Sequence, residues 1–108
     1  MDPACLENAL TDEEAQHFRE NGFFIVENAI PQSTVDELIP IVDRIDKEER
    51  ARMTLEPGER VNHYDFIGKH AAFLELLDCP TTFPKVWGIL GWHVQLYHTH
   101  MTFTPPEP

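Results

Sequence analysis

The sequence predicts a small α+β domain, and three patterns along its 108 residues support this fold class. Apolar residues recur at helical spacing between Val35 and Ile45. Residues 23–30 are almost all apolar, which is typical of a strand covered on both faces. Residues 92–103 are mostly β-branched, aromatic or long, with no Gly or Pro among them, which favours a second strand. A chain of this length supports one domain at most.

Residues 10–30 predict a helix that leads through a glycine into the first strand. Thr11 is suited to cap the helix, and Glu14 three residues later completes a capping box. Asn21-Gly22 ends the helix, because Gly readily adopts the left-handed conformation found at helix C-termini. The apolar strand follows at once, and Pro31 ends it.

Residues 33–90 predict a run of helices, with Ser33 as the cap of the first. The apolar stripe of that helix consists of Val35, Leu38, Ile39, Val42 and Ile45. Because a Pro inside a helix costs roughly 3 kcal/mol, we expect Pro40 to cause a kink or to separate two shorter helices. Later segments are a loop at 50–60, an extended or irregular stretch at 60–67, and short helices at 69–77 and 81–90. Trp87 and Trp92 are expected in the core.

The composition excludes several classes of protein. The net charge of −11 argues against nucleic-acid binding, because the phosphates would be repelled. No apolar run is long enough to cross a bilayer, and the first residues show neither the basic nor the apolar region of a signal peptide. Nothing in the spacing of Cys5 and Cys79 asks for a disulfide, so we expect reduced thiols and a cytoplasmic location.

Side chains alternate between two faces along the strand predicted at residues 92–103. His98 and His100 therefore share one face, together with Val94, Leu96 and Thr102. Imidazoles at positions i and i+2 on one face are placed to hold a metal ion or to hydrogen-bond a bound acid. The other face carries His93, Gln95, Tyr97, Thr99, Met101 and Phe103.

Two stretches of the chain resemble the phytanoyl-CoA dioxygenase family. The first is LTDEEAQHFRENGFFIVENAIP, in which a short helix after a Leu-Thr start leads through Gly into a strand ending in Pro. The second is FLELLDCPTTFPKVWGILGWHVQLYHTHMTFTPPEP, with a Leu-Leu-x-x-Pro turn, a helix, a Leu-Gly break and a strand running into prolines. In order and spacing they match the family over nearly the whole chain, from Leu10 to Pro106.

The resemblance implies a non-haem Fe(II) oxygenase that uses 2-oxoglutarate, built as a double-stranded β-helix (a jelly-roll, cupin-like barrel) flanked by N-terminal helices. The family's iron ligands are two His and one carboxylate, written H-x-D with a distant His, and this triad leaves positions open for the 2-oxoacid and O₂. These ligands and a cosubstrate-binding Arg follow the Pro-rich segment.

By this register, residues 1–108 are the N-terminal portion of such an enzyme: one incomplete domain without the iron triad, inactive alone. Its expected parts are a helix–strand unit at 10–30, a helical buttress at 33–90 and a barrel strand at 92–103. A small-molecule substrate, Fe(II) and 2-oxoglutarate belong to the complete enzyme, and we expect no cofactor on these residues alone. Unpaired strand edges predict poor solubility or a monomer of low stability, and the oligomeric state stays open.

His63-Tyr64-Asp65 is itself an H-x-D, and His98 or His100 would be its distant partner. The register of the resemblance argues against this assignment, because His63 precedes the helices that lead to the strand. Short motifs of this kind also occur by chance. The alternative is a loop in which His63 or Asp65 caps a turn.

His98 and His100 are the stronger metal candidates, because neutral imidazole suits Fe, Zn or Ni. A carboxylate would still be needed, from Asp65 or Glu107. The alternative, which the resemblance favours, is that these histidines line the barrel interior and face substrate or cosubstrate without binding metal.

Two other functions stay open besides the oxygenase. The apolar stripe from Val35 to Ile45 also fits a small acidic helical binding module without a cofactor. A self-contained metal-binding protein that uses His98 and His100 is the third.

Overall fold

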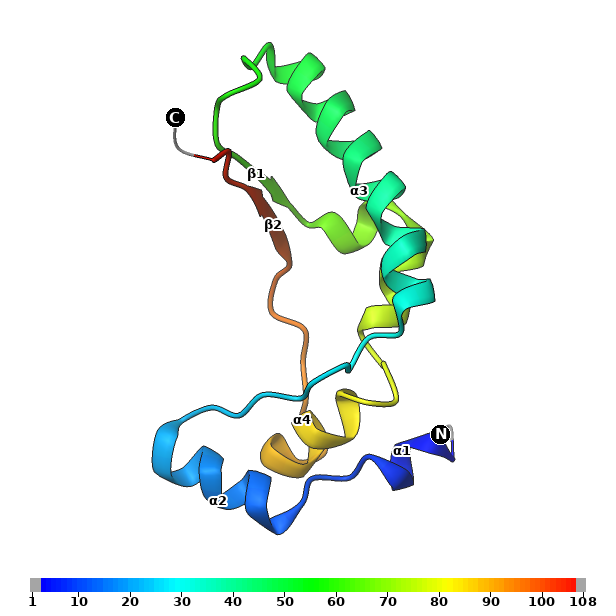
Figure 1. Ribbon diagram of the computed structural model, residues 1–108, viewed down its shortest axis with the longest axis vertical. Helices are drawn as coiled ribbons and strands as arrows, with labels where there is room; N and C mark the ends of the chain where they lie inside the picture. The colour runs from blue at the N-terminus through cyan, green and yellow to red at the C-terminus, as the bar shows by residue number, and fades with distance from the viewer. Residues whose placement is uncertain (1–2, 107–108) are drawn as a thin grey trace. The chain divides into compact units, whose positions relative to one another are not determined.

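The computed structural model describes residues 3–106, and the chain divides into two compact units. Unit 1 comprises Met1–Pro31 and Glu75–Gln95, and unit 2 comprises Gln32–Leu74 and Leu96–Pro108. Figure 1 shows the helices and strands of both units. Helices predominate, and no helix in the described part is long and apolar enough to span a membrane.

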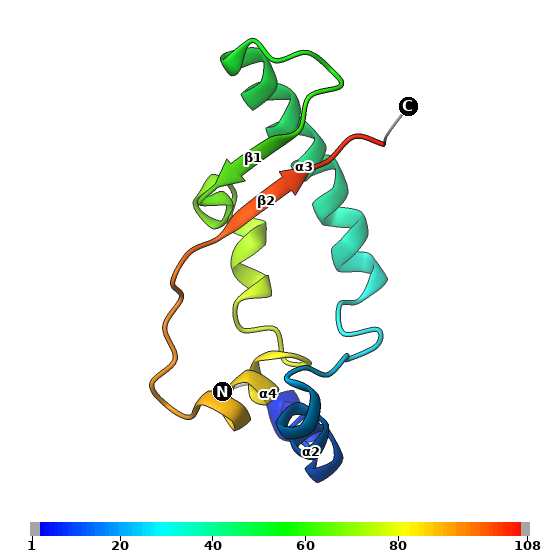
Figure 2. The same ribbon diagram turned by 90° about the vertical axis from the view of Figure 1, so that its left-hand side faces the viewer.

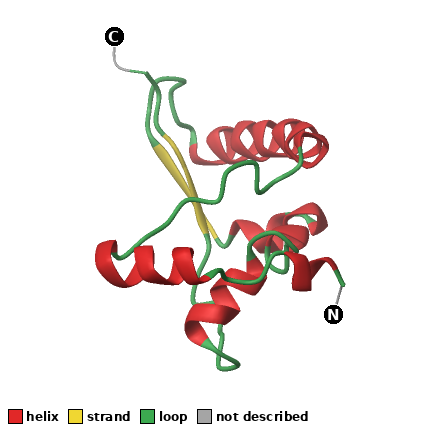
Figure 3. Ribbon diagram, turned by 60° about the horizontal axis from the view of Figure 1, so that its bottom comes forward, coloured by secondary structure: helices red, strands yellow, loops and turns green. Residues whose placement is uncertain are grey.

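The predicted fold class, an α+β domain with the first strands of a jelly-roll barrel, is wrong. Residues 3–106 contain one sheet of two antiparallel strands amid helices and loops (Figure 3). A jelly roll needs about eight strands. Most residues of the apolar runs that predicted longer strands are not in a strand and have no strand partner among these residues.

The described residues of unit 1 form three helices, α1 (Ala4–Glu7), α2 (Asp12–Asn21) and α4 (Phe83–Leu90). The prediction for α2 is confirmed, because Thr11 and Glu14 form the expected capping box and Gly22, at φ 79°, ends the helix. Both bonds of the box, from the Glu14 N–H to Thr11 Oγ1 and from the Thr11 N–H to Glu14 Oε1, measure 3.1 Å. Each of these capping interactions involves residues no more than four positions apart, so local sequence is sufficient to predict them.

The strand predicted at residues 23–30 is wrong, because this segment pairs with no strand in the described chain. Asn28 has φ 52°, a left-handed conformation that interrupts an extended backbone. Phe23 is 54% exposed and Ile25 is 77% exposed, so the segment is not covered on both faces. The Thr81 hydroxyl donates to the Ala29 carbonyl and ties the segment to the chain just before α4.

Unit 2 is built on α3 (Gln32–Met53), a helix that continues through Pro40. The alternative of two shorter helices is therefore wrong, and the helix includes the first four residues of the loop predicted at 50–60. Ser33 is not its cap, because the helix already begins at Gln32. Pro40 removes one backbone hydrogen-bond donor from the helix. The packing of α3 on β1 (Val61–Tyr64), which buries Ile45, offsets that loss.

The sheet of unit 2 pairs β1 (Val61–Tyr64) with β2 (His100–Phe103) in antiparallel register, with Val61 opposite Phe103 and Tyr64 opposite His100 (Figure 2). Burial alternates along both strands, so the sheet has a covered face and an exposed face. The covered face, which includes the β1 residues that pack near α3, carries Val61, His63, Met101 and Phe103. The exposed face carries Asn62, Tyr64, His100 and Thr102.

Two of the sequence predictions for unit 2 need correction in length or type. Only the last four residues of the strand predicted at 92–103 are paired, because β1 is itself four residues long. The helix predicted at 69–77 appears as two 3₁₀ segments, η1 (Phe66–Lys69) and η2 (Ala71–Leu76). Between them they place Phe73, 1% exposed, edge-on against Phe66 at a ring-centroid separation of 5.0 Å.

Replacing Gly88 with Ala tests how closely α4 approaches the chain before α2. A Cβ at Gly88 would lie 2.7 Å from Cβ of Leu10, and backbone must move to relieve that contact. We expect the free energy of unfolding to fall by about 1–3 kcal/mol, although Ala gains up to about 1 kcal/mol in helix propensity. Chemical denaturation followed by circular dichroism measures the change.

Gly58→Ala is the matched control, because nothing lies within 4 Å of the added Cβ. Its free energy of unfolding should change by no more than about 0.5 kcal/mol. A Gly88→Ala protein as stable as the parent would contradict the close packing of α4.

Candidate functional site

His63 is the most buried of the predicted site residues, at 2% exposure. Its Nε2 lies 2.8 Å from Oδ1 of Asp46 on α3, and its ring stands edge-on to Phe103 at 5.6 Å. The other carboxylate oxygen, Oδ2, accepts a hydrogen bond of 2.7 Å from Arg50 Nε. One carboxylate therefore joins a strand histidine to a helix arginine.

The charge on Asp46 is stabilised by these two partners. Burial raises its pKa, but hydrogen bonds from His63 and Arg50 and the charge of Arg50 outweigh burial and hold the pKa below its ordinary value of 3.8. His63 Nδ1 is buried without a hydrogen-bond partner in the described chain. That arrangement fits a proton on Nε2, donated to Asp46, because a buried N–H at Nδ1 would have no acceptor.

Arg50 also fixes the loop that follows α3. Its Nη1 donates to the carbonyl oxygens of Glu59, at 2.8 Å, and Glu56, at 3.3 Å. These bonds fix the conformation of the loop that connects α3 to β1. The cluster of Asp46, Arg50 and His63 thus has an architectural role in unit 2, because it joins α3, the loop after it and β1.

Asp65 does not join His63, although the two residues complete an H-x-D in sequence. Asp65 has φ 54°, lies just before η1 and is exposed. Its backbone N–H donates to the Thr99 carbonyl at 2.7 Å, which ends the pairing of β1. The left-handed turn at Asp65 leads the chain away from the strand, so the motif does not bring its imidazole and carboxylate to one ion.

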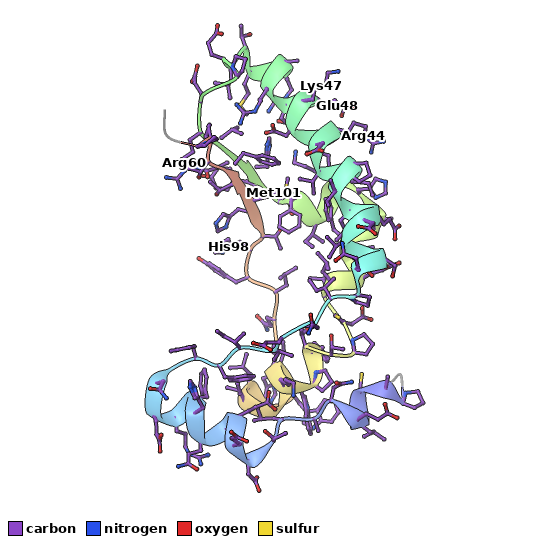
Figure 4. The ribbon with its side chains drawn as sticks, viewed as in Figure 1. Arg44, Lys47, Glu48, Arg60, His98 and Met101 are labelled. Atoms are coloured by element: carbon purple, nitrogen blue, oxygen red, sulfur yellow. The ribbon has the colours of Figure 1, made fainter. Side chains whose placement is uncertain are left out.

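His98 and His100 do lie together, as alternation along an extended chain predicts. Their rings stack with centroids 5.4 Å apart and planes 15° apart. Both side chains are exposed, on the side of the sheet opposite His63. The expectation that they line a barrel interior falls with the barrel, because the covered face carries Met101 and Phe103 instead. Figure 4 labels His98 just before β2 and Met101 within it.

The residues of the described chain do not fit the iron triad of two His and one carboxylate. Between residues 3 and 106, no three or more His, Cys, Asp or Glu side chains gather where a metal ion would fit. His63 is bonded to Asp46, and Asp65 is turned away. Glu107, the other predicted carboxylate, lies outside the described residues. No catalytic step on iron can be assigned to these side chains.

Unit 1 contains an apolar cavity of about 250 Å³ between α1 and α4. It is lined by Cys5, Leu6, Ala9, Phe83, Pro84, Trp87 and Trp92. The two indole rings meet edge-on at 5.2 Å. The expectation that both tryptophans lie in the core is wrong, because Trp87 is 39% exposed and Trp92 is 75% exposed. The cavity has no charged side chain in its wall, so it suits an apolar group.

Lys85 and Glu14 form a second charged contact that the sequence did not reveal. Lys85 is 9% exposed, and its Nζ donates to Glu14 Oε1 at 2.7 Å and to the Ala9 carbonyl at 3.4 Å. Burial raises the pKa of Glu14, but the bonds from Lys85 and Thr11 lower it below its ordinary value of 4.5. The same carboxylate thus caps α2 and joins it to α4.

The sequence carried only part of the signal for these contacts. Asp46 and Arg50 are four residues apart on a helix, a spacing that favours an ion pair. Nothing local points from Asp46 to His63, seventeen positions away, or from Glu14 to Lys85, seventy-one positions away. Both partners become visible only when helix and strand, or two helices, are packed.

Comparison with known proteins identifies no relative: no family model, curated protein or solved structure matches the chain. The resemblance to the phytanoyl-CoA dioxygenase family therefore stays a prediction that rests on the two motif stretches.

Replacing Asp46 and Asp65 separately with Asn tests which carboxylate His63 uses. Asp46→Asn removes the charge that both His63 and Arg50 contact, so we expect the free energy of unfolding to fall by about 1–3 kcal/mol. Asp65→Asn keeps a residue that tolerates a positive φ and disturbs no side-chain bond of His63, so its change should stay within about 0.5 kcal/mol. Urea denaturation at neutral pH measures both. Equal losses in the two variants, or a larger loss for Asp65→Asn, would contradict the assignment.

Proposed function

We propose that this chain is the N-terminal portion of a non-haem Fe(II)/2-oxoglutarate-dependent dioxygenase of the phytanoyl-CoA dioxygenase type. The two motif stretches support the family. The observation that carries the proposed role is the amount of large apolar side chain left uncovered in both units. These residues would then supply a packing surface to the rest of the enzyme, and the iron ligands would come from the segment that follows the prolines.

The uncovered apolar side chains are numerous for a chain of this size. Those at least 60% exposed are Leu6, Ile25, Tyr64, Leu90, Trp92, Leu96 and Tyr97. Burying one such side chain fully is worth about 1.5–3 kcal/mol, and large exposed apolar patches mark surfaces that another polypeptide or a ligand covers. Contact with further chain of the same enzyme gives these side chains the burial that residues 3–106 do not.

In the complete enzyme, the proposed reaction consumes one O₂: one oxygen atom hydroxylates a C–H bond of a small molecule, and the other enters the succinate formed when 2-oxoglutarate loses CO₂. The described residues would support the part of the enzyme that carries the iron ligands, and by themselves they would be inactive. An intracellular, cytoplasmic site of action is part of the proposal, supported by two unpaired thiols, Cys5 and Cys79.

The small acidic binding module without a cofactor receives less support. Its argument was the apolar stripe on α3, and that stripe is partly used within unit 2, where Ile45 is 5% exposed and the helix contacts β1. Ile39 remains open at 52% exposure. Charged side chains that include Arg44, Lys47 and Glu48 lie on the side of α3 turned away from the strands (Figure 4).

The test is to read the open reading frame past Pro108 and to express the polypeptide up to its stop codon. We expect an H-x-D with a distant His downstream, and Fe(II)-dependent succinate formation from 2-oxoglutarate by the longer protein. Asp65→Asn should keep that activity, because Asp65 is exposed and does not contact His63, whereas replacing the His of the downstream H-x-D should abolish it. A stop codon directly after Pro108, or a longer protein without these ligands and without 2-oxoglutarate turnover, would contradict the proposal.

A further inference from the structure

We propose that His98 and His100 form a two-histidine chelate for a divalent transition-metal ion of the Cu²⁺, Ni²⁺ and Zn²⁺ group. The site lies on the exposed side of the sheet in unit 2. It is independent of the proposed oxygenase function, because it uses neither an H-x-D nor 2-oxoglutarate.

The separation of the two rings is close to what a shared ion requires. Zinc–imidazole bonds measure about 2.0–2.1 Å, so two nitrogens on one ion lie no more than about 4.2 Å apart. The ring centroids are 5.4 Å apart and the planes differ by 15°. Both side chains are exposed, so rotation about their side-chain torsions closes the remaining gap without moving packed atoms.

The backbone between the two histidines is held in place. The Thr99 carbonyl accepts the Asp65 N–H at 2.7 Å, and Thr99 Oγ1 accepts the Ile67 N–H at 3.5 Å. His100 itself pairs with Tyr64 in the sheet. The i and i+2 side chains are thus fixed on one side of the chain before an ion arrives, and such preorganisation favours chelation over binding by one imidazole.

Aromatic rings flank the pair on both sides. Tyr97 lies edge-on to His98 at 5.0 Å, and Tyr64 lies against His100 at 6.5 Å. These tyrosine rings provide a nearby fluorescent reporter. The net charge of −11 also raises the concentration of cations near the surface.

The ligand set determines which ions bind. Two neutral imidazoles leave the other coordination positions to water, because no third His, Cys, Asp or Glu of the described residues joins them. Imidazole suits Cu²⁺, Ni²⁺ and Zn²⁺, whereas Mg²⁺ and Ca²⁺ prefer oxygen ligands. By the general order of divalent affinities, Cu²⁺ binds more tightly than Ni²⁺ or Zn²⁺, and Fe²⁺ binds more weakly than any of them.

The experiment titrates CuCl₂ and NiCl₂ into the 108-residue chain by isothermal calorimetry, with tyrosine fluorescence in parallel. We expect one ion per chain at this site, quenching by Cu²⁺, and no binding of MgCl₂ at the same concentration. His98→Gln and His100→Gln should each weaken Cu²⁺ binding about tenfold or more, which corresponds to about 1.4 kcal/mol. Circular dichroism verifies that the exposed substitutions keep the fold.

His93→Gln is the matched control, because His93 is an exposed histidine just before the same extended segment and faces no second imidazole in the described structure. Its affinity for Cu²⁺ should equal that of the parent. The proposal is overturned if only one of His98 and His100 matters, if neither does, or if His93→Gln weakens binding as much. Each of these results leaves the oxygenase proposal untouched, since that proposal depends on ligands beyond Pro108.

Discussion

The constraint on which unit 2 depends is the carboxylate of Asp46, which holds His63 of β1 and Arg50 of α3 at the same time. Arg50 in turn binds two carbonyl oxygens of the loop between α3 and β1. A partly buried carboxylate without partners would be costly, and with these two it is retained as a charged group. Helix, loop and strand therefore meet around one side chain.

The histidines of unit 2 have two different roles. His63, which the sequence pairs with Asp65 in an H-x-D, is engaged in the packing of helix and strand. His98 and His100 lie on the opposite side of the sheet, where their rings stack and their side chains are exposed. Unit 1 contains an apolar cavity lined by Trp87 and Trp92, and large apolar side chains are exposed in both units.

Local signals in the sequence were sufficient for some elements. The capping box of Thr11 and Glu14 and the end of α2 at Gly22 lie within a few residues of one another, so the sequence alone places that helix. The shared face of His98 and His100 likewise follows from alternation along extended chain. These features need no knowledge of what packs where.

Strand formation and buried charge could not be predicted in the same way. Residues 23–30 have the composition of a buried strand, but a strand exists only with a partner, and Asn28 turns the chain instead. The H-x-D motif places Asp65 two residues from His63, but the carboxylate that His63 contacts is Asp46 on the preceding helix. Such pairs join residues distant in sequence, and only the packing of elements selects them.

The most direct test of the role of Asp46 is to determine which imidazole nitrogen of each histidine carries a proton. Long-range ¹H–¹⁵N NMR correlation at neutral pH measures this. The structure predicts a single tautomer for His63, with its proton on Nε2 and protected from exchange with solvent by Asp46. It predicts that the ring N–H protons of His98 and His100 exchange rapidly with solvent, because both side chains are exposed. A His63 ring that exchanges as fast as these two, or that carries its proton on Nδ1, would contradict the central role of Asp46.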